Sequence, residues 1–116
     1  MNREFIMTPE FDKNWVKLGL NDDDLKKLQE EILINTKVGP VIEGTGGLRK
    51  LRFALDAGKS GGARVLYIDL AIYEEVYLIS VFPKNEKINL SKAEKNAVKK
   101  VIEQLKMSAQ KRRFRK

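Results

Sequence analysis

The spacing of hydrophobic positions divides the first third of the chain into one strand and two helices. A short apolar run at 4–7 predicts the strand. Thr8 and Pro9 follow in the order that favours a helix start, with Thr8 as N-cap and Pro9 at the first helical position. A second helix is expected from about Asn21, because the three aspartates after it suit the positive end of the helix dipole. Apolar residues at helical spacing support both helices: Phe11, Trp15 and Leu18, then Leu25, Leu28, Ile32 and Leu33.

Beyond residue 40 the pattern changes to the alternation that is typical of strands. Residues 48–55, 64–71 and 76–82 predict three strands, with a glycine-rich loop after the first and a short turn after the second. In the first of these strands Leu51 and Phe53 would share one face, which leaves the opposite face to polar residues. The last strand is apolar enough to be central in a sheet.

A last helix is expected after Ser91, because Ser91 and Glu94 have the spacing of a capping box. The predicted order is therefore β-α-α-β-β-β-α. That order indicates an α+β fold in which a small antiparallel sheet packs against an N-terminal helical hairpin and a C-terminal helix. We expect one domain over residues 1–110, followed by a basic, solvated tail at 111–116.

The composition fits a globular protein and removes several kinds of chemistry. Of the 116 residues, 42% are hydrophobic and 34% are charged. Cysteine and histidine are both absent, which excludes disulfides and thiolate metal sites and removes the commonest metal ligand. We therefore predict neither a metal nor a cofactor. No apolar run approaches the roughly 18–20 residues of a membrane helix, and the start lacks the apolar core of a signal peptide, so we expect a cytoplasmic protein without a membrane partner.

The positive charge indicates a polyanionic partner, and its distribution is more informative than its total. The formal net charge is +7. The last six residues hold five cations, and without them 18 cations face 16 acids, which leaves the rest of the chain at +2. A tighter cluster lies in the predicted strands and the loop between them, where five cations fall within sixteen positions: Arg49, Lys50, Arg52, Lys59 and Arg64. These charges repel one another unless a polyanion such as nucleic acid lies across them.

Two features of this cluster allow more than one interpretation. Lys50 and Arg52 would share a strand face that we expect to look into a cleft, and the alternative is a solvated sheet edge whose charges prevent aggregation. Lys59 begins the segment KSGG, whose backbone amides could hold phosphate although the segment is not a P-loop.

The aromatic residues are expected in the core or at its rim rather than as platforms for stacked bases: Trp15, Tyr67 and Tyr77.

Three segments combine these features into a recognisable set of motifs: GTGGLRKLRFA, GKSGGARVLYI and YLISVFPKNEKINLSKAE. In this order and spacing they resemble the RelE/HigB-like toxins of bacterial type II toxin–antitoxin systems, and the HigB branch especially. The likeness extends over about residues 30–105. It implies a microbial-RNase-like fold that enters the ribosomal A site, contacts ribosomal RNA and cleaves mRNA there. It also implies a cognate helix-turn-helix antitoxin, through which the toxin would reach operator DNA.

The resemblance also assigns roles to residues. RNA cleavage by the 2′-hydroxyl needs a base, a cation that stabilises the phosphorane and an acid, and in a chain without histidine a lysine among other cations can supply one of these. Arg64 fits the family's catalytic arginine, and Lys84 corresponds to a cationic active-site position. Lys50 and Glu86 complete the catalytic candidates. The segment KNEKINLS has no match for a tyrosine that some relatives use, which shifts weight to the lysines. The expected RNA contacts are Arg49, Arg52, Lys59, Asn85 and Lys87.

Two other functions remain open from the sequence. The cation cluster could bind RNA or DNA without cutting it, because the usual histidine catalysts are absent. A related toxin branch, typified by ParE, acts on a protein target such as gyrase. Cleavage mapping in translating extracts with and without ribosomes would separate these alternatives from the endoribonuclease.

Overall fold

The computed structural model describes residues 2–54 and 62–114, the last two of these by their backbone only. Within these ranges the predicted order of elements is confirmed, with a short 3₁₀ helix, η1, added before the last strand. The elements are β1 (Glu4–Met7), α1 (Pro9–Lys17), α2 (Asp22–Ile34), β2 (Arg49–Phe53), β3 (Ala63–Leu70), η1 (Ala71–Tyr73), β4 (Glu75–Pro83) and α3 (Lys92–Phe114).

The sheet has the order β1-β4-β3-β2, with the apolar β4 in its interior. The β2–β3 and β3–β4 pairs are antiparallel, as predicted. The expectation of a wholly antiparallel sheet is wrong for β1, which runs parallel to β4, with Phe5 opposite Val76. The side-chain alternation of a strand is the same in either direction, so the sequence pattern contains no information about this pairing.

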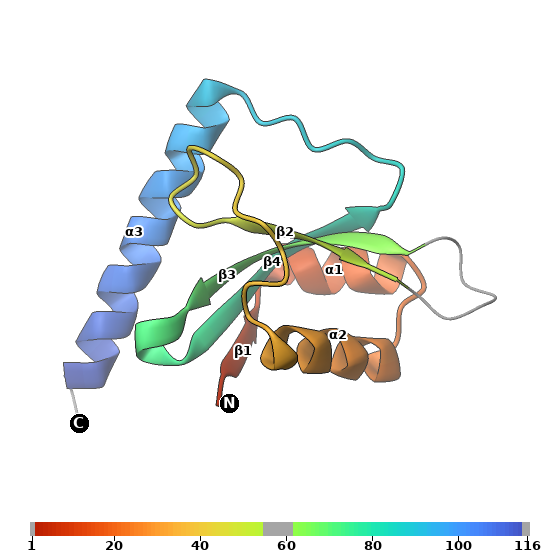
Figure 1. The fold of residues 1–116 in the computed structure, drawn as a ribbon, viewed down its shortest axis with the longest axis horizontal. Helices are drawn as coiled ribbons and strands as arrows, with labels where there is room; N and C mark the ends of the chain where they lie inside the picture. The colour runs from red at the N-terminus through yellow and green to blue at the C-terminus, as the bar shows by residue number, and fades with distance from the viewer. Residues whose placement is uncertain (1, 55–61, 115–116) are drawn as a thin grey trace.

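Helices cover the two faces of the sheet (Figure 1). On one face α1 and α2 bury a core with the inner side of the strands, and Phe11, Leu28 and Val65 are among its completely buried residues. On the other face α3 packs through Ile102 against strand residues that include Leu66. The aromatic residues predicted for the core are buried, with exposed fractions of 5% for Trp15, 0% for Tyr67 and 6% for Tyr77.

Capping side chains fix the helix starts where the sequence predicts them. The Thr8 hydroxyl accepts a hydrogen bond from the Phe11 amide at 3.1 Å, and Pro9 occupies the first turn of α1. Asn21 begins α2 with a capping box, in which its side chain accepts from the Asp24 amide while Asp24 accepts from the Asn21 amide. The predicted box of Ser91 and Glu94 is also present, with hydrogen bonds of 3.0 and 3.1 Å.

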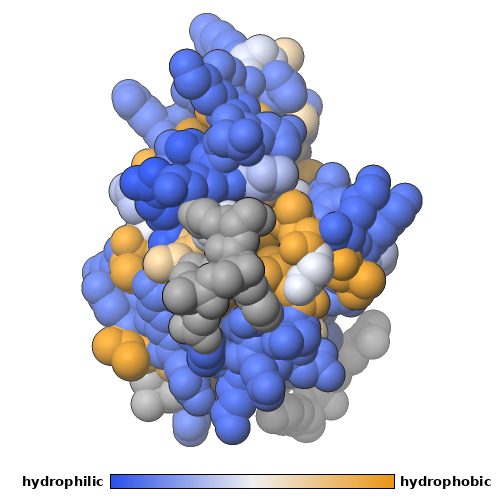
Figure 2. Space-filling view, turned by 90° about the vertical axis from the view of Figure 1, so that its right-hand side faces the viewer, coloured by the Kyte–Doolittle hydropathy of each residue, from blue (hydrophilic) through white to orange (hydrophobic). Residues whose placement is uncertain are grey.

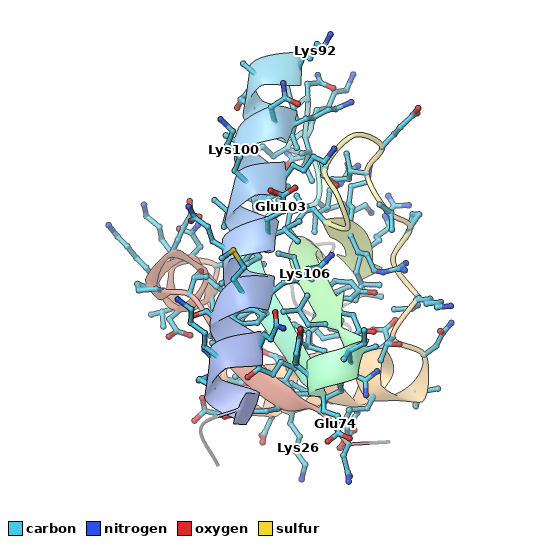
Figure 3. The ribbon with its side chains drawn as sticks, turned by 90° about the vertical axis from the view of Figure 1, so that its left-hand side faces the viewer. Lys26, Glu74, Lys92, Lys100, Glu103 and Lys106 are labelled. Carbon is cyan, nitrogen blue, oxygen red and sulfur yellow. The ribbon has the colours of Figure 1, made fainter. Side chains whose placement is uncertain are left out.

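The last helix is longer than the sequence pattern indicates. α3 continues to Phe114, so residues 111–114 are part of the helix and not of a separate tail beginning at residue 111. Arg112 lies in this last turn and its Nη2 donates to both carboxylate oxygens of Glu75 at 2.9 Å and to the Tyr77 hydroxyl at 3.1 Å. These contacts tie the end of the helix to β4. Figure 3 shows Lys92, Lys100 and Lys106 distributed along the length of α3.

Candidate nucleic-acid interface and active site

Three of the predicted cations converge on one face of β2 and β3. Arg52 and Arg64 are directly opposite each other in the antiparallel register, and Lys50 lies two residues before Arg52 on the same face. The residues between them, Leu51 and Phe53, are buried with exposed fractions of 4%, so the predicted alternation of β2 is confirmed. We call Lys50, Arg52 and Arg64 the cation cluster. Like charges directly opposite on neighbouring strands destabilise a sheet, so this arrangement favours an anionic partner.

No side chain of the cation cluster forms an ion pair with an acid in the described part of the chain. Two ion pairs of the described residues lie elsewhere, one between Arg3 and Asp69 and one between Arg112 and Glu75, each with a shortest N–O distance below 3 Å. Arg52 is exposed, and Lys50 and Arg64 are half-buried. Guanidinium groups that are accessible and unpaired are suited to bidentate contact with phosphate.

The cation cluster lines an open groove with a volume of about 410 Å³. A site of this size is within the range that holds a nucleotide-sized ligand, roughly 300–1,000 Å³. Sequence reasoning missed the other side of the groove, because its residues belong to α2 and to the segment that leads into β2 and form no local pattern. These residues are Glu31, Val38 and Pro40, and Leu51 of β2 completes the lining.

A buried tyrosine holds the segment that forms this missed side. The Tyr67 hydroxyl donates to the Thr36 carbonyl at 2.9 Å and accepts from the Gly39 amide at 3.0 Å. Gly39 allows this close approach, because a Cβ there would lie 2.8 Å from the Lys50 carbonyl oxygen and 2.9 Å from Tyr67 Cε1. Burial raises the pKa of Tyr67, and the charge of Glu31 adds to the rise. The hydroxyl therefore remains a neutral donor and acceptor across the physiological pH range.

Arg49 lies apart from the cation cluster, although it was predicted to contact RNA. It is opposite Tyr67 in the register and so on the face that packs against α1 and α2. Its Nη1 donates to the Gly39 carbonyl at 2.8 Å. The alternation of strand residues predicts this face for Arg49, because Arg49 is separated by an even number of positions from the buried Leu51 and Phe53. In this structure Arg49 supports the segment before β2.

The other predicted site residues fall into two groups. Lys84, Asn85, Glu86 and Lys87 are exposed in the turn after β4, where the Glu86 amide donates to the Pro83 carbonyl at 3.0 Å. None of these four lines the groove. Because Pro83 is opposite Ala63, the turn is nevertheless at the same end of the sheet as Arg64. Lys59 and its KSGG segment lie outside the described residues, apart from Gly62.

The surface on the right-hand side of the molecule in Figure 1 is mostly hydrophilic. Figure 2 looks at the right-hand side of the molecule of Figure 1; hydrophilic residues dominate the upper part of this view, and apolar patches lie in its middle and lower parts. Across the ranges that the structure covers, no grouping of three or more acids could hold a metal ion. In the same ranges no helix is both long enough and apolar enough to cross a membrane. The structure is therefore an α+β domain with an open groove lined by three cations.

Comparison with known proteins identifies the family of this domain. The family model described as the RelE toxin of the RelE/RelB toxin–antitoxin system matches residues 5–114, which is nearly the whole chain. The chain therefore belongs to this family and is a toxin of a toxin–antitoxin system. Family membership implies a cognate antitoxin as its partner. The predicted resemblance to RelE-like toxins is confirmed, and the assignment to the HigB branch stays a prediction.

A solved structure shows the same fold. The chain is similar to an Escherichia coli RelE toxin in the free state, a variant with two arginines replaced by alanine, with a TM-score of 0.54 and 22% sequence identity. The match covers 73% of this chain and 86% of that one. At this identity the likeness supports the arrangement of helices and strands, and the roles of individual residues rest on the geometry above.

Proposed function

We propose that this toxin is an endoribonuclease that cleaves mRNA in the ribosomal A site and so inhibits translation. The observation that supports it best is the cation cluster, which lines a nucleotide-sized groove and has no acid paired to it in the described part of the chain. Such a groove favours a phosphate backbone over a protein target. The cytoplasm, where translating ribosomes are found, is the proposed location.

The proposed reaction is transfer of the RNA phosphate to its own 2′-oxygen. The 2′-oxygen forms a bond to phosphorus as its proton is removed, and the bond to the 5′-oxygen breaks as that oxygen takes up a proton. The products are a 2′,3′-cyclic phosphate and a 5′-hydroxyl. Arg64 is assigned the role of stabilising the negative charge of the phosphorane, because it lines the groove and a guanidinium can hold two phosphate oxygens at once.

Proton transfer is assigned to the lysines. Lys50 lines the groove and takes the proton of the 2′-hydroxyl, while Lys84 approaches from the turn after β4 and supplies the proton to the 5′-oxygen. Glu86 orients Lys84 or replaces Lys50 as the base. Further RNA contacts are proposed for Arg52, Lys59, Asn85 and Lys87, and contacts with ribosomal RNA for the exposed lysines of α3 (Figure 3).

Single-turnover cleavage on ribosomes programmed with a defined A-site codon tests this function. Arg64→Ala is expected to lower the cleavage rate by about 10²–10³-fold, the usual effect of removing one group that stabilises the transition-state charge. Lys13→Ala, which removes an exposed cation from α1, is the matched control and should cleave at the wild-type rate. Cleavage by Arg64→Ala at the wild-type rate would show that the groove is not the active site.

Conservative exchanges separate proton transfer from charge in the same assay. Lys50→Arg keeps the charge but gives up the ability to transfer a proton near neutral pH, so it should bind programmed ribosomes normally and cleave slowly. Lys84→Arg should be milder if charge is the main contribution of Lys84. Full activity of Lys50→Arg would remove Lys50 as the base and leave Glu86 in that role.

The same experiments identify the alternative functions. Binding of RNA without cleavage by the wild-type protein would indicate a non-catalytic nucleic-acid-binding module. Intact mRNA together with a loss of DNA supercoiling would indicate a toxin that acts on gyrase. We propose that the cognate antitoxin is a helix-turn-helix protein, so that the toxin contacts operator DNA only as part of their complex. Co-purification of the two proteins on an operator fragment tests this.

A further inference from the structure

One residue of the groove does not fit a site that holds only phosphate. Glu31, a half-buried residue near the end of α2, lines the groove together with the cation cluster. Within the described residues it forms no ion pair with Lys50, Arg52 or Arg64, although all four side chains border the same space. An available carboxylate repels a phosphate group. Beside a bound phosphate the carboxylate is best compensated when the ligand also offers hydrogen-bond donors.

The residues beside Glu31 form an apolar wall. Val38 and Pro40 come from the segment held by Tyr67, and Leu51 of β2, which is only 4% exposed, borders the groove beside them. An apolar wall beside a carboxylate suits a nucleobase, which has a flat apolar face and a polar edge. Proteins recognise single-stranded RNA in this way, by packing against the faces of splayed bases and by hydrogen bonds to their Watson–Crick edges.

We propose that Glu31, Val38 and Pro40 form a nucleobase subsite that selects guanine beside the phosphate held by the cation cluster. The proposal rests on the proposed function, in that RNA is the ligand, and adds which base the groove accepts. Guanine presents adjacent N1–H and N2–H donors, which match the two oxygens of one carboxylate. Cytosine and adenine present only their amino group. The single N3–H donor of uracil lies between two carbonyl oxygens that a carboxylate repels.

Binding of free nucleotides to the full chain tests the subsite without ribosomes or cleavage. The probes are 3′-GMP and 3′-UMP, which share a ribose phosphate for the cation cluster and differ in the base. We expect 3′-GMP to shift the methyl NMR signals of Val38 and Leu51 and to bind at least about fivefold more tightly than 3′-UMP, the lower range for one bidentate base contact. Glu31→Gln should remove that preference, because an amide places a donor opposite a donor of guanine.

Glu30→Gln is the matched control, because Glu30 is the preceding exposed residue of α2 and does not line the groove. It should keep the guanine preference, and circular dichroism should confirm that both variants are folded. Equal binding of 3′-GMP and 3′-UMP, or an unchanged preference in Glu31→Gln, would overturn the subsite. Selective nucleotide binding by a protein that cleaves no mRNA would uphold the subsite and refute the proposed function. Cleavage of mRNA without any dependence on Glu31 would uphold the proposed function and refute the subsite.

Discussion

Tyr67→Phe is the change that tests most directly how the groove is built. It removes one oxygen from a completely buried side chain and leaves the ring in place. That oxygen makes two hydrogen bonds with buried residues, donating to the Thr36 carbonyl and accepting from the Gly39 amide at 2.9 and 3.0 Å. Both backbone groups lose this partner in the variant.

The expected cost follows from these two bonds. A buried backbone group that loses its partner costs about 1–3 kcal/mol, so two of them should lower the free energy of unfolding by about 2–4 kcal/mol after partial relaxation. For a chain of this size that is a fall in melting temperature of roughly 10 °C. Because the same segment carries Val38 and Pro40 into the groove, RNA binding should weaken as well.

Thermal and urea unfolding followed by far-UV circular dichroism measures the effect. Tyr73→Phe is the matched control, since the Tyr73 side chain is only partly buried and its hydroxyl takes part in none of the hydrogen bonds among the described residues. It should unfold like the wild type. A loss of less than about 2 °C in Tyr67→Phe would refute the reasoning that this hydroxyl holds the segment before β2.

Comparing the stability of the wild type and of Tyr67→Phe at different pH values gives a second test, in which the direction of the change can be predicted. Because burial raises the pKa of Tyr67 in the folded protein, the unfolded chain ionises first as the pH rises above about 10. The stability that the neutral hydroxyl contributes is therefore complete below that pH and is lost as the pH rises through the folded pKa. Since Tyr67→Phe has nothing to ionise at this position, its stability should approach that of the wild type at alkaline pH. A constant difference up to pH 11 would contradict this.

Two further changes test the cation cluster and the end of α3. Arg52→Gln relieves the repulsion from Arg64, so it should raise the free energy of unfolding by a few tenths of a kcal/mol in low salt and by less in 0.5 M salt. RNA binding should weaken at the same time. A lower free energy of unfolding in low salt would argue against repulsion. Arg112→Met leaves the nearly buried carboxylate of Glu75 without its cation, and the half-exposed position of Arg112 limits the expected cost to about 1–2 kcal/mol in urea unfolding. Lys111→Met, one residue earlier and also exposed, should be neutral, and equal effects of the two changes would refute a specific contact.

Local patterns predict most of the elements of this fold. Periodicity and capping residues place each helix and strand within a few positions, because these signals depend on neighbours in sequence. The direction of β1 and the length of α3 could not be predicted in this way. Both depend on partners far along the chain: β1 pairs with β4, and the last turn of α3 is held by the contact of Arg112 with Glu75.

The candidate site shows the same division. Lys50, Arg52 and Arg64 could be grouped from the sequence because β2 and β3 are consecutive strands that pair with each other. Glu31 and Pro40 could not, because tertiary packing brings the end of α2 and the segment before β2 to the edge of the sheet. Arg49 lies on the other face of β2 and contacts the Gly39 carbonyl, so its role as an RNA contact stays a prediction.

The position of β4 has a consequence for how the toxin comes into existence. β4 is one of the two interior strands of the sheet, yet it is synthesised after all the other strands that the structure describes. β1 has no partner in the sheet until residues 75–83 have been made, and α1 packs on a sheet that lacks an interior strand until then. Because such long-range pairing must wait for the later segment, we expect the nascent chain to stay unfolded and harmless until residues 75–83 have been made. A toxin shortened before β4 should therefore be inert even though every residue of its cation cluster is present.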